Sequence, residues 1–144
     1  VEFRNLVEML IGIDLSEKMI GKTKEKNIYD ELYINDLIGG LEALETKFDL
    51  FVSSDVLIYI GDLLPLFKTI KDHANTNSLF IFSTEDTSGD DFYLRKTGRF
   101  SHSNAYIIRI ATKLGFQLEH FERSNLRKDK DQWIIGGIYI LRYI

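Results

Sequence analysis

The chain has 144 residues, of which 44% are hydrophobic and 28% are charged, a balance typical of a folded globular protein. It contains no cysteine, which excludes disulfides, thiolate metal sites and a cysteine nucleophile. The 18 basic and 22 acidic residues give a net charge of -4, which disfavours an extended nucleic-acid surface and favours a small-molecule partner. No apolar run reaches the ~18 residues of a membrane span, and residues 1–5 do not resemble a secretion signal. We therefore expect a single cytoplasmic domain over residues 1–144, with no membrane contact.

The first part of the chain alternates between helix-like and strand-like patterns. Apolar residues from Phe3 to Leu10 recur at helical spacing, and an uninterrupted apolar run ending at Asp14 follows them. Ser16 is placed to cap the next helix. The expected elements are a helix over residues 3–10, a strand over 10–13, a helix over 17–26, a strand over 32–34, a helix over 37–45 and a buried strand over 48–54.

The second part continues the alternation and ends in two long strands. Asp62 is expected to cap a helix that carries Pro65 in its first turn and ends near Ala74. Ser103 can cap a later helix that Gly115 closes. The expected elements are a helix over residues 63–74, a strand over 79–82, a polar loop over 83–102, a helix over 104–114, and strands over 116–126 and 133–143 that form a hairpin around the turn-prone residues 127–131.

This order indicates an α/β fold. Strands that alternate with helices favour a Rossmann-like, mostly parallel sheet with helices on both faces, and the closing pair of strands adds an antiparallel C-terminal hairpin. In such a sheet, ligands bind just beyond the carboxyl ends of the strands. The side chains at those ends therefore have to be considered as site residues.

Acidic and hydroxyl side chains occupy these strand ends: Asp14, Asp36, and Ser53 with Ser54. A carboxylate in the position of Asp14 can accept both hydroxyls of a ribose, and each such charge-assisted hydrogen bond contributes ~1.5–3 kcal/mol. The alternative is that Asp14 only caps the following helix. Since Ser16 is better placed as that cap, the ligand role is favoured.

Three segments resemble a known family in their order and separation. They are Ile11-Gly12-Ile13-Asp14-Leu15-Ser16-Glu17-Lys18-Met19-Ile20, the run over residues 28–37, and the run over residues 48–63. The chain is similar over nearly its whole length to class I S-adenosylmethionine-dependent methyltransferases. It is similar to a bacterial subgroup described as TPR-associated or type 11/12 methyltransferases, in which Gly98-Arg99-Phe100-Ser101-His102-Ser103 with Tyr106 also has a counterpart.

The resemblance implies a set of cofactor contacts. Asp14 binds the ribose hydroxyls of S-adenosylmethionine, and Leu15 and Met19 lie in the segment beside the adenosine. Asp36 faces the adenine amino group, and Leu37 offers its backbone N–H to the ring. Alternatives stay open, because Met19 can be ordinary core and Asp36 can be only a turn former.

The resemblance also implies contacts nearer to the reacting groups. Ser53 and Ser54 lie beside the methionine part of the cofactor. Tyr59 lies near the methyl group or the acceptor, although an aromatic residue there can also be a packing residue.

The chain departs from the family pattern at its beginning. The family's first strand and glycine-rich loop have no counterpart, since no Gly-x-Gly pattern occurs in the 144 residues, and the first residue is Val1, within a helical pattern. We therefore expect the domain to be N-terminally incomplete. The natural protein should carry ~30–60 further residues upstream, about the length of a βα unit with a lead-in helix.

The histidines and the acidic residues of the polar loop have to be weighed separately. His73 and His120 fit structural positions. His102 lies at the end of the polar loop, where a substrate-positioning or proton-accepting role competes with a structural one. The acidic residues of the loop match no metal-ligand spacing, so we expect no metal site and a solvated lid instead; they are Glu85, Asp86, Asp90 and Asp91.

The function expected from these observations is transfer of a methyl group from S-adenosylmethionine to a small-molecule acceptor. Two alternatives stay open: a nucleotide-dependent oxidoreductase, in which Asp14 would also bind a ribose, and a non-catalytic binding or scaffold remnant of the methyltransferase fold. No Tyr-x-x-x-Lys pair supports the oxidoreductase. The sequence determines neither the acceptor nor the oligomeric state.

Overall fold

A computed structural model describes residues 3–144. The expectation for residues 1–5 therefore lies partly outside the described residues. The chain divides into two compact units, one that ends at Glu45 and one from Thr46 to Ile144. The single domain expected from the chain length stays a prediction.

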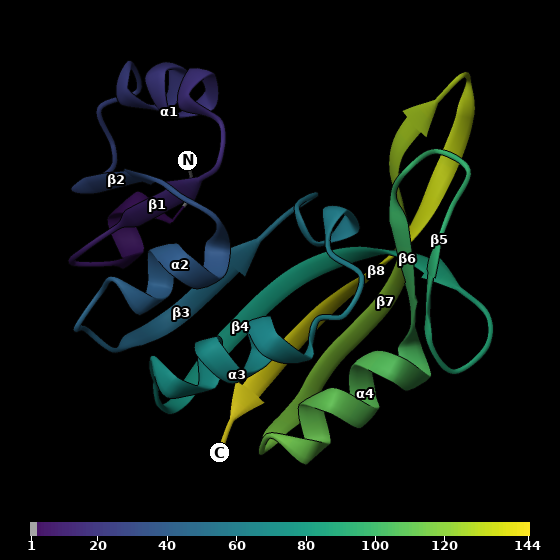
Figure 1. Cartoon of the computed structure of the whole chain (residues 1–144). Helices are drawn as coiled ribbons and strands as arrows, with labels where there is room; N and C mark the ends of the chain where they lie inside the picture. Colours follow the sequence, from purple (N-terminus) through teal and green to yellow (C-terminus); the bar gives the residue numbers. More distant parts are fainter. Residues whose placement is uncertain (1–2) are drawn as a thin grey trace. The chain divides into compact units, whose positions relative to one another are not determined.

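The first unit contains two short parallel strands and two helices. Asp14, the last residue of the first strand, lies opposite Ile34, the last residue of the second. The helices lie on opposite sides of the two strands (Figure 1). The elements are the 3-10 turn η1 (Arg4–Leu6), β1 (Ile11–Asp14), α1 (Glu17–Lys24), β2 (Glu31–Ile34) and α2 (Leu37–Glu42).

The helix expected over residues 3–10 is wrong beyond its first turn. Only Arg4–Leu6 is helical, and Val7 is already extended. The Arg4 guanidinium donates to the backbone carbonyls of Val7 and Glu8 and pairs with the Asp30 carboxylate at 2.6 Å. The Asp30 carboxylate also accepts the backbone N–H of Leu10 at 2.7 Å. Side chains thus provide partners for the backbone groups of Val7, Glu8 and Leu10. The segment can therefore stay extended, despite its helical spacing of apolar residues.

The second unit is built on a six-stranded sheet. Its strand order is β5-β6-β4-β8-β7, and β3 pairs with β4 off this path. The pairs β3–β4 and β4–β6 are parallel, whereas β4–β8, β5–β6 and β7–β8 are antiparallel. The elements are β3 (Phe48–Ser53), the 3-10 turn η2 (Leu57–Tyr59), α3 (Leu64–Asp72), β4 (Ala74–Thr87), β5 (Phe92–Leu94), β6 (Phe100–Ser103), α4 (Asn104–Lys113), β7 (Phe116–Asp129) and β8 (Gln132–Tyr143).

The expected α/β class and the C-terminal hairpin are confirmed. The hairpin is longer than its apolar pattern indicates, since β7 and β8 pair up to Asp129 and Gln132. Ser16 and Ser103 cap their helices by accepting the backbone N–H of Met19 and Tyr106. Gly115 follows α4 with φ of 87°, a conformation that costs glycine little.

An aromatic cluster forms the core of the second unit. The Phe67 ring of α3 lies 5.3 Å from that of Phe80 and 5.6 Å from that of Phe82, measured between centroids. The Phe82 ring also stacks on Tyr139 at 5.0 Å. Alternate residues of β4 thus face α3, which lies with α4 on one side of the sheet (Figure 1). This core supports the middle of β4, next to which β3 ends.

The polar loop expected over residues 83–102 is mostly sheet. The strand β4 continues to Thr87, and its residues from Leu79 to Glu85 pair with β8. Residues 92–94 and 100–103 then form a small hairpin whose second strand runs beside β4. Polar side chains do not prevent strand formation here because the backbone groups find partners in β6 and β8. The structure therefore offers no long irregular lid.

Candidate functional site

In the first unit, the carboxylate of Asp14 is held at the carboxyl end of β1. Its Oδ1 accepts the backbone N–H of Ser16 at 2.7 Å, and its other oxygen has no partner within residues 3–144. The side chain is half-buried. A fixed carboxylate with one oxygen available suits a ligand with neighbouring hydroxyls.

Apolar side chains next to Asp14 are exposed. Leu15 is 73% and Met19 is 49% exposed, whereas Ile20 is buried and anchors α1. Met19 is therefore not core within its unit. An apolar or aromatic ligand group could cover these two side chains.

Asp36 follows β2 and caps α2. Its Oδ1 accepts the backbone N–H of Gly39 at 2.8 Å, so the turn-forming role weighed for Asp36 is present. The residue is exposed, which leaves its second oxygen accessible. Because β1 and β2 are parallel neighbours, Asp14 and Asp36 lie at the same edge of their sheet.

In the second unit, a pocket of about 160 Å³ lies at the carboxyl end of β3, beside the middle of β4. Ser53 ends β3, and the next turn bends through Asp55, whose φ is 57°. The backbone N–H of Asp55 donates to the Ser83 hydroxyl of β4 at 3.1 Å. The pocket is lined by Val52, Ser53, Ser54, Asp55, Ile81, Phe82, Ser83, Leu126 and Ile138.

A network of ion pairs lies next to this pocket. The buried Glu85 carboxylate accepts Arg99 at 3.0 Å and also Arg127. Arg127 pairs in addition with Asp55 at 2.5 Å, and Arg99 pairs with Asp129 at 2.8 Å. The network therefore ties the turn after β3 to β4, to the β5–β6 turn and to the β7–β8 hairpin.

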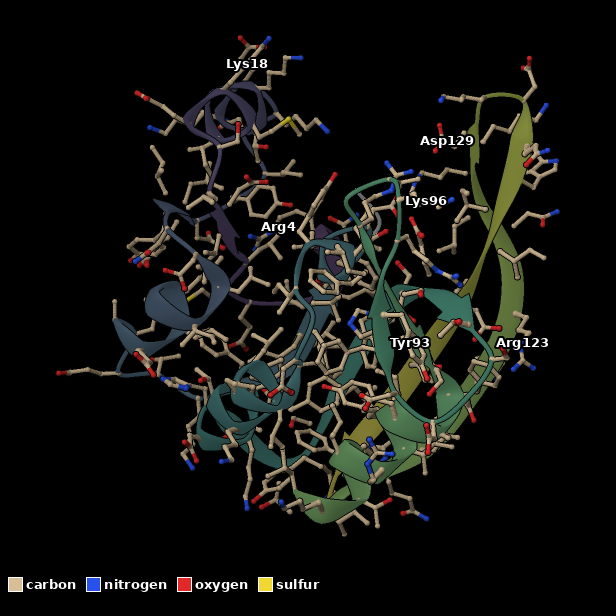
Figure 2. The ribbon with its side chains drawn as sticks, turned by 45° about the vertical axis from the view of Figure 1, so that its right-hand side comes forward. Arg4, Lys18, Tyr93, Lys96, Arg123 and Asp129 are labelled. Carbon is tan, nitrogen blue, oxygen red and sulfur yellow. The ribbon has the colours of Figure 1, made fainter. Side chains whose placement is uncertain are left out.

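The network was missed in the sequence because its members are far apart in the chain. Arg127 lies 42 residues from Glu85 and 72 from Asp55. Figure 2 shows the labelled Arg123 and Asp129 on the β7–β8 hairpin; Arg123 pairs with Asp86 at 2.6 Å. Glu85 and Asp86 are thus ion-paired strand residues, which corrects the expectation of a solvated lid for these two, whereas Asp90 and Asp91 are exposed.

The Tyr59 side chain is exposed, whereas the His102 side chain is buried against the backbone that follows Tyr59. Tyr59 ends η2 with a side chain that is 68% exposed, while Leu57 and Ile58 before it are buried. The His102 ring is fully buried, and its Nε2 lies 2.9 Å from the carbonyl oxygens of both Ile60 and Gly61. A histidine that touches a ligand would need a more exposed position.

The buried ring makes stability sensitive to pH. Burial lowers the pKa of His102, against the opposing effects of its bonds to the Gly61 and Ile60 carbonyls and of the Glu85 charge. Because the pKa is lowered in the folded protein, the unfolded chain takes up the proton first as the pH falls. The contribution of the neutral ring to the free energy of unfolding is therefore fully present above pH 6.5 and is lost as the pH falls through the folded pKa.

We expect the free energy of unfolding to fall more steeply between pH 7.5 and 5 in the wild type than in His102→Gln, which cannot titrate. Urea unfolding at several pH values measures this difference. The other two histidines, His73 and His120, are present in both proteins and cancel. Parallel pH profiles for the two proteins would contradict the prediction.

Within residues 3–144, no cluster of three or more potential metal ligands occurs. No helix in that range is long and apolar enough to cross a membrane.

Similarity to known proteins is found at the level of three-dimensional structure. No protein-family model and no curated protein matches the chain. A methyltransferase from Methanosarcina mazei, described as S-adenosylmethionine-dependent, has a TM-score of 0.71 at 13% identity, over 99% of this chain and 85% of its own. A putative S-adenosylmethionine-dependent methyltransferase from Listeria monocytogenes has a TM-score of 0.74 at 19% identity, over 96% and 81%.

A third solved structure is the N-methyltransferase NodS from Bradyrhizobium japonicum, in complex with S-adenosyl-L-homocysteine. It has a TM-score of 0.72 at 16% identity, over 97% of this chain and 70% of its own. At these identities the similarity concerns the fold. The chain has the Rossmann-like α/β fold of S-adenosylmethionine-dependent methyltransferases.

Proposed function

We propose that the protein transfers a methyl group from S-adenosylmethionine to a small-molecule acceptor. The observation that carries the proposal is the Asp14 carboxylate, which is fixed by Ser16 at the end of β1 and keeps one oxygen available. The exposed Leu15 and Met19 beside it suit an adenosine. The fold shared with S-adenosylmethionine-dependent enzymes, one of them solved with S-adenosyl-L-homocysteine, supports this cofactor.

The remaining cofactor contacts belong to the same proposal. Asp36 would accept the adenine amino group with its free oxygen, next to the backbone N–H of Leu37. Ser53 and Ser54 would line the methionine end. We also propose that the protein belongs to the type 11/12 subgroup, on the strength of the segment 98–103 with Tyr106.

S-Adenosylmethionine supplies a methyl group on a positively charged sulfur, which makes that carbon open to attack by a nucleophile. The protein's part is to hold the acceptor in line and to exclude competing geometries, because orientation alone can lower the barrier by several kcal/mol. Tyr59, exposed six residues after the end of β3, is the residue we place beside the acceptor. A dedicated base is needed only for an acceptor that carries a proton at neutral pH.

Calorimetric titration of the complete protein with S-adenosyl-L-homocysteine tests the cofactor assignment, and NADH serves as the comparison ligand. Binding of S-adenosyl-L-homocysteine alone is expected. Binding of NADH alone would favour the oxidoreductase. Binding of neither would favour the non-catalytic remnant.

A further inference from the structure

Residues 60–63, which join η2 to α3, are held at two points by residues distant in sequence. Near the end of β6, the His102 ring binds the carbonyls of Ile60 and Gly61. One helical turn later, the Tyr106 hydroxyl accepts the backbone N–H of Leu63 at 2.7 Å and donates to Asp62 at 2.9 Å. We call this pair, His102 and Tyr106, the clamp.

The chemistry of the His102 contacts defines its protonation state. Carbonyl oxygens only accept hydrogen bonds, so Nε2 must carry the hydrogen. The other nitrogen, Nδ1, is buried and has no partner within residues 3–144. The ring is therefore neutral and shares one N–H between two carbonyls. Nδ1 keeps an unused lone pair, but the ring is fully buried, so a ligand cannot reach it.

The clamped backbone is also closely packed at Gly61. A Cβ at Gly61 would come within 2.8 Å of the Phe100 ring and 3.0 Å of the Phe92 ring. These two rings belong to the β5–β6 hairpin and pack at 6.2 Å from each other. The hairpin thus closes residues 60–61 from the side, while the clamp holds them by hydrogen bonds.

The clamp holds the backbone next to Tyr59 in one position. The backbone N–H of Tyr59 donates to the Val56 carbonyl at 3.1 Å, and that of Ile60 donates to Leu57 at 3.0 Å. Leu57 and Ile58 are anchored in the core. With the next carbonyls bound to His102, the backbone is hydrogen-bonded on both sides of Tyr59.

We propose that His102 and Tyr106 are positioning residues, which hold the backbone of residues 60–63 so that Tyr59 is presented in one place to the methyl acceptor. The acceptor part of this inference rests on the proposed function, whereas the clamp itself does not. Neither residue contacts the acceptor. His102 thereby acts through the backbone, in place of the direct substrate role expected from its position in the sequence.

The test uses the complete protein labelled with 3-fluorotyrosine, in which the Tyr59 resonance is identified by its loss in Tyr59→Phe. In His102→Leu we expect this resonance to move or broaden. The Tyr59 and Ile60 amides should exchange with solvent about tenfold faster, the effect of losing one hydrogen bond of ~1.4 kcal/mol. Amides of β4 and β8 should change much less.

His102→Gln provides the matched rescue, because its side-chain N–H group can still donate to the two carbonyls. It should keep the wild-type Tyr59 resonance. Tyr106→Phe removes only the hydroxyl and should speed exchange at Leu63, whereas the control Tyr143→Phe should not. If His102→Leu does not fold, Tyr106→Phe and His102→Gln still decide the question.

The inference is overturned if the Tyr59 resonance and local exchange are the same in His102→Leu as in the wild type, or if glutamine rescues no better than leucine. Titration with S-adenosyl-L-homocysteine separates this result from the proposed function. Affinity should stay within about twofold in all clamp variants, since they lie outside the proposed cofactor contacts. A wild type that does not bind this ligand counts against the function, while the fluorine signals still report on the clamp.

Discussion

Replacing Asp14 with alanine in the complete protein is expected to weaken binding of S-adenosyl-L-homocysteine by roughly 2–4 kcal/mol, a loss of about 30- to 1,000-fold in affinity. In the wild type, the Ser16 backbone N–H holds the carboxylate at 2.7 Å and leaves one oxygen free. The substitution removes this carboxylate, and with it the two charge-assisted hydrogen bonds proposed to the ribose. Calorimetric titration of both proteins measures the effect.

The matched control is Ser16→Ala, which removes the cap on the Met19 N–H and leaves the Asp14 carboxylate in place. Both substitutions remove one local hydrogen bond, so both should cost stability by only about 1 kcal/mol. Only Asp14→Ala should lose ligand affinity. Equal affinities in Asp14→Ala and the wild type would remove the basis for the ribose assignment.

The second large effect is expected at Glu85. Replacing it with glutamine should lower the free energy of unfolding by about 3–5 kcal/mol, because Arg99 and Arg127 would lose the buried carboxylate between them. Glutamine has nearly the same volume, so a cavity does not contribute. Urea denaturation followed by circular dichroism measures the change.

A control for the charge alone is Glu119→Gln, whose pair with Arg142 at 2.6 Å is about one-third exposed on both sides. Pairs of this kind contribute at most about 1 kcal/mol. If Glu85→Gln costs no more than Glu119→Gln, the buried network does not hold the β5–β6 turn and the hairpin to β4. The losses of Glu85→Gln and Arg127→Met should not add, because the two residues share one ion pair.

The network and the clamp act on neighbouring parts of the same unit. Glu85 is in β4, and its partner Arg99 directly precedes β6, the strand that carries His102. The residues around the β3 turn are thus held by buried polar contacts as well as by the aromatic core. This arrangement favours a backbone that is already in place around the proposed acceptor end before a ligand binds.

Local signals in the sequence predicted the features that depend on near neighbours. The caps by Ser16 and Ser103 and the turn at Gly115 each involve groups within four residues, so residue type and spacing determine them. The alternation of helices and strands likewise established the α/β class. Two strand-like runs around the turn-prone residues 127–131 also predicted the hairpin, although not its full length.

Tertiary structure alone decided the rest, because the deciding partners are distant in the chain. Residues 83–87 read as a polar loop but are strand, since β6 and β8 supply their backbone partners. The helix over residues 3–10 gave way to contacts between Arg4 and Asp30, 26 residues away.

Contacts between distant residues also decided the candidate site. The sequence by itself placed Asp14 at a strand end and Tyr59 beyond another, because strand ends follow from local apolar runs. It could not show that His102 is buried against Ile60 and Gly61, more than 40 residues away, or that two arginines share the Glu85 carboxylate. The exposure of a polar side chain depends on which distant segments pack over it, and only the folded chain determines that.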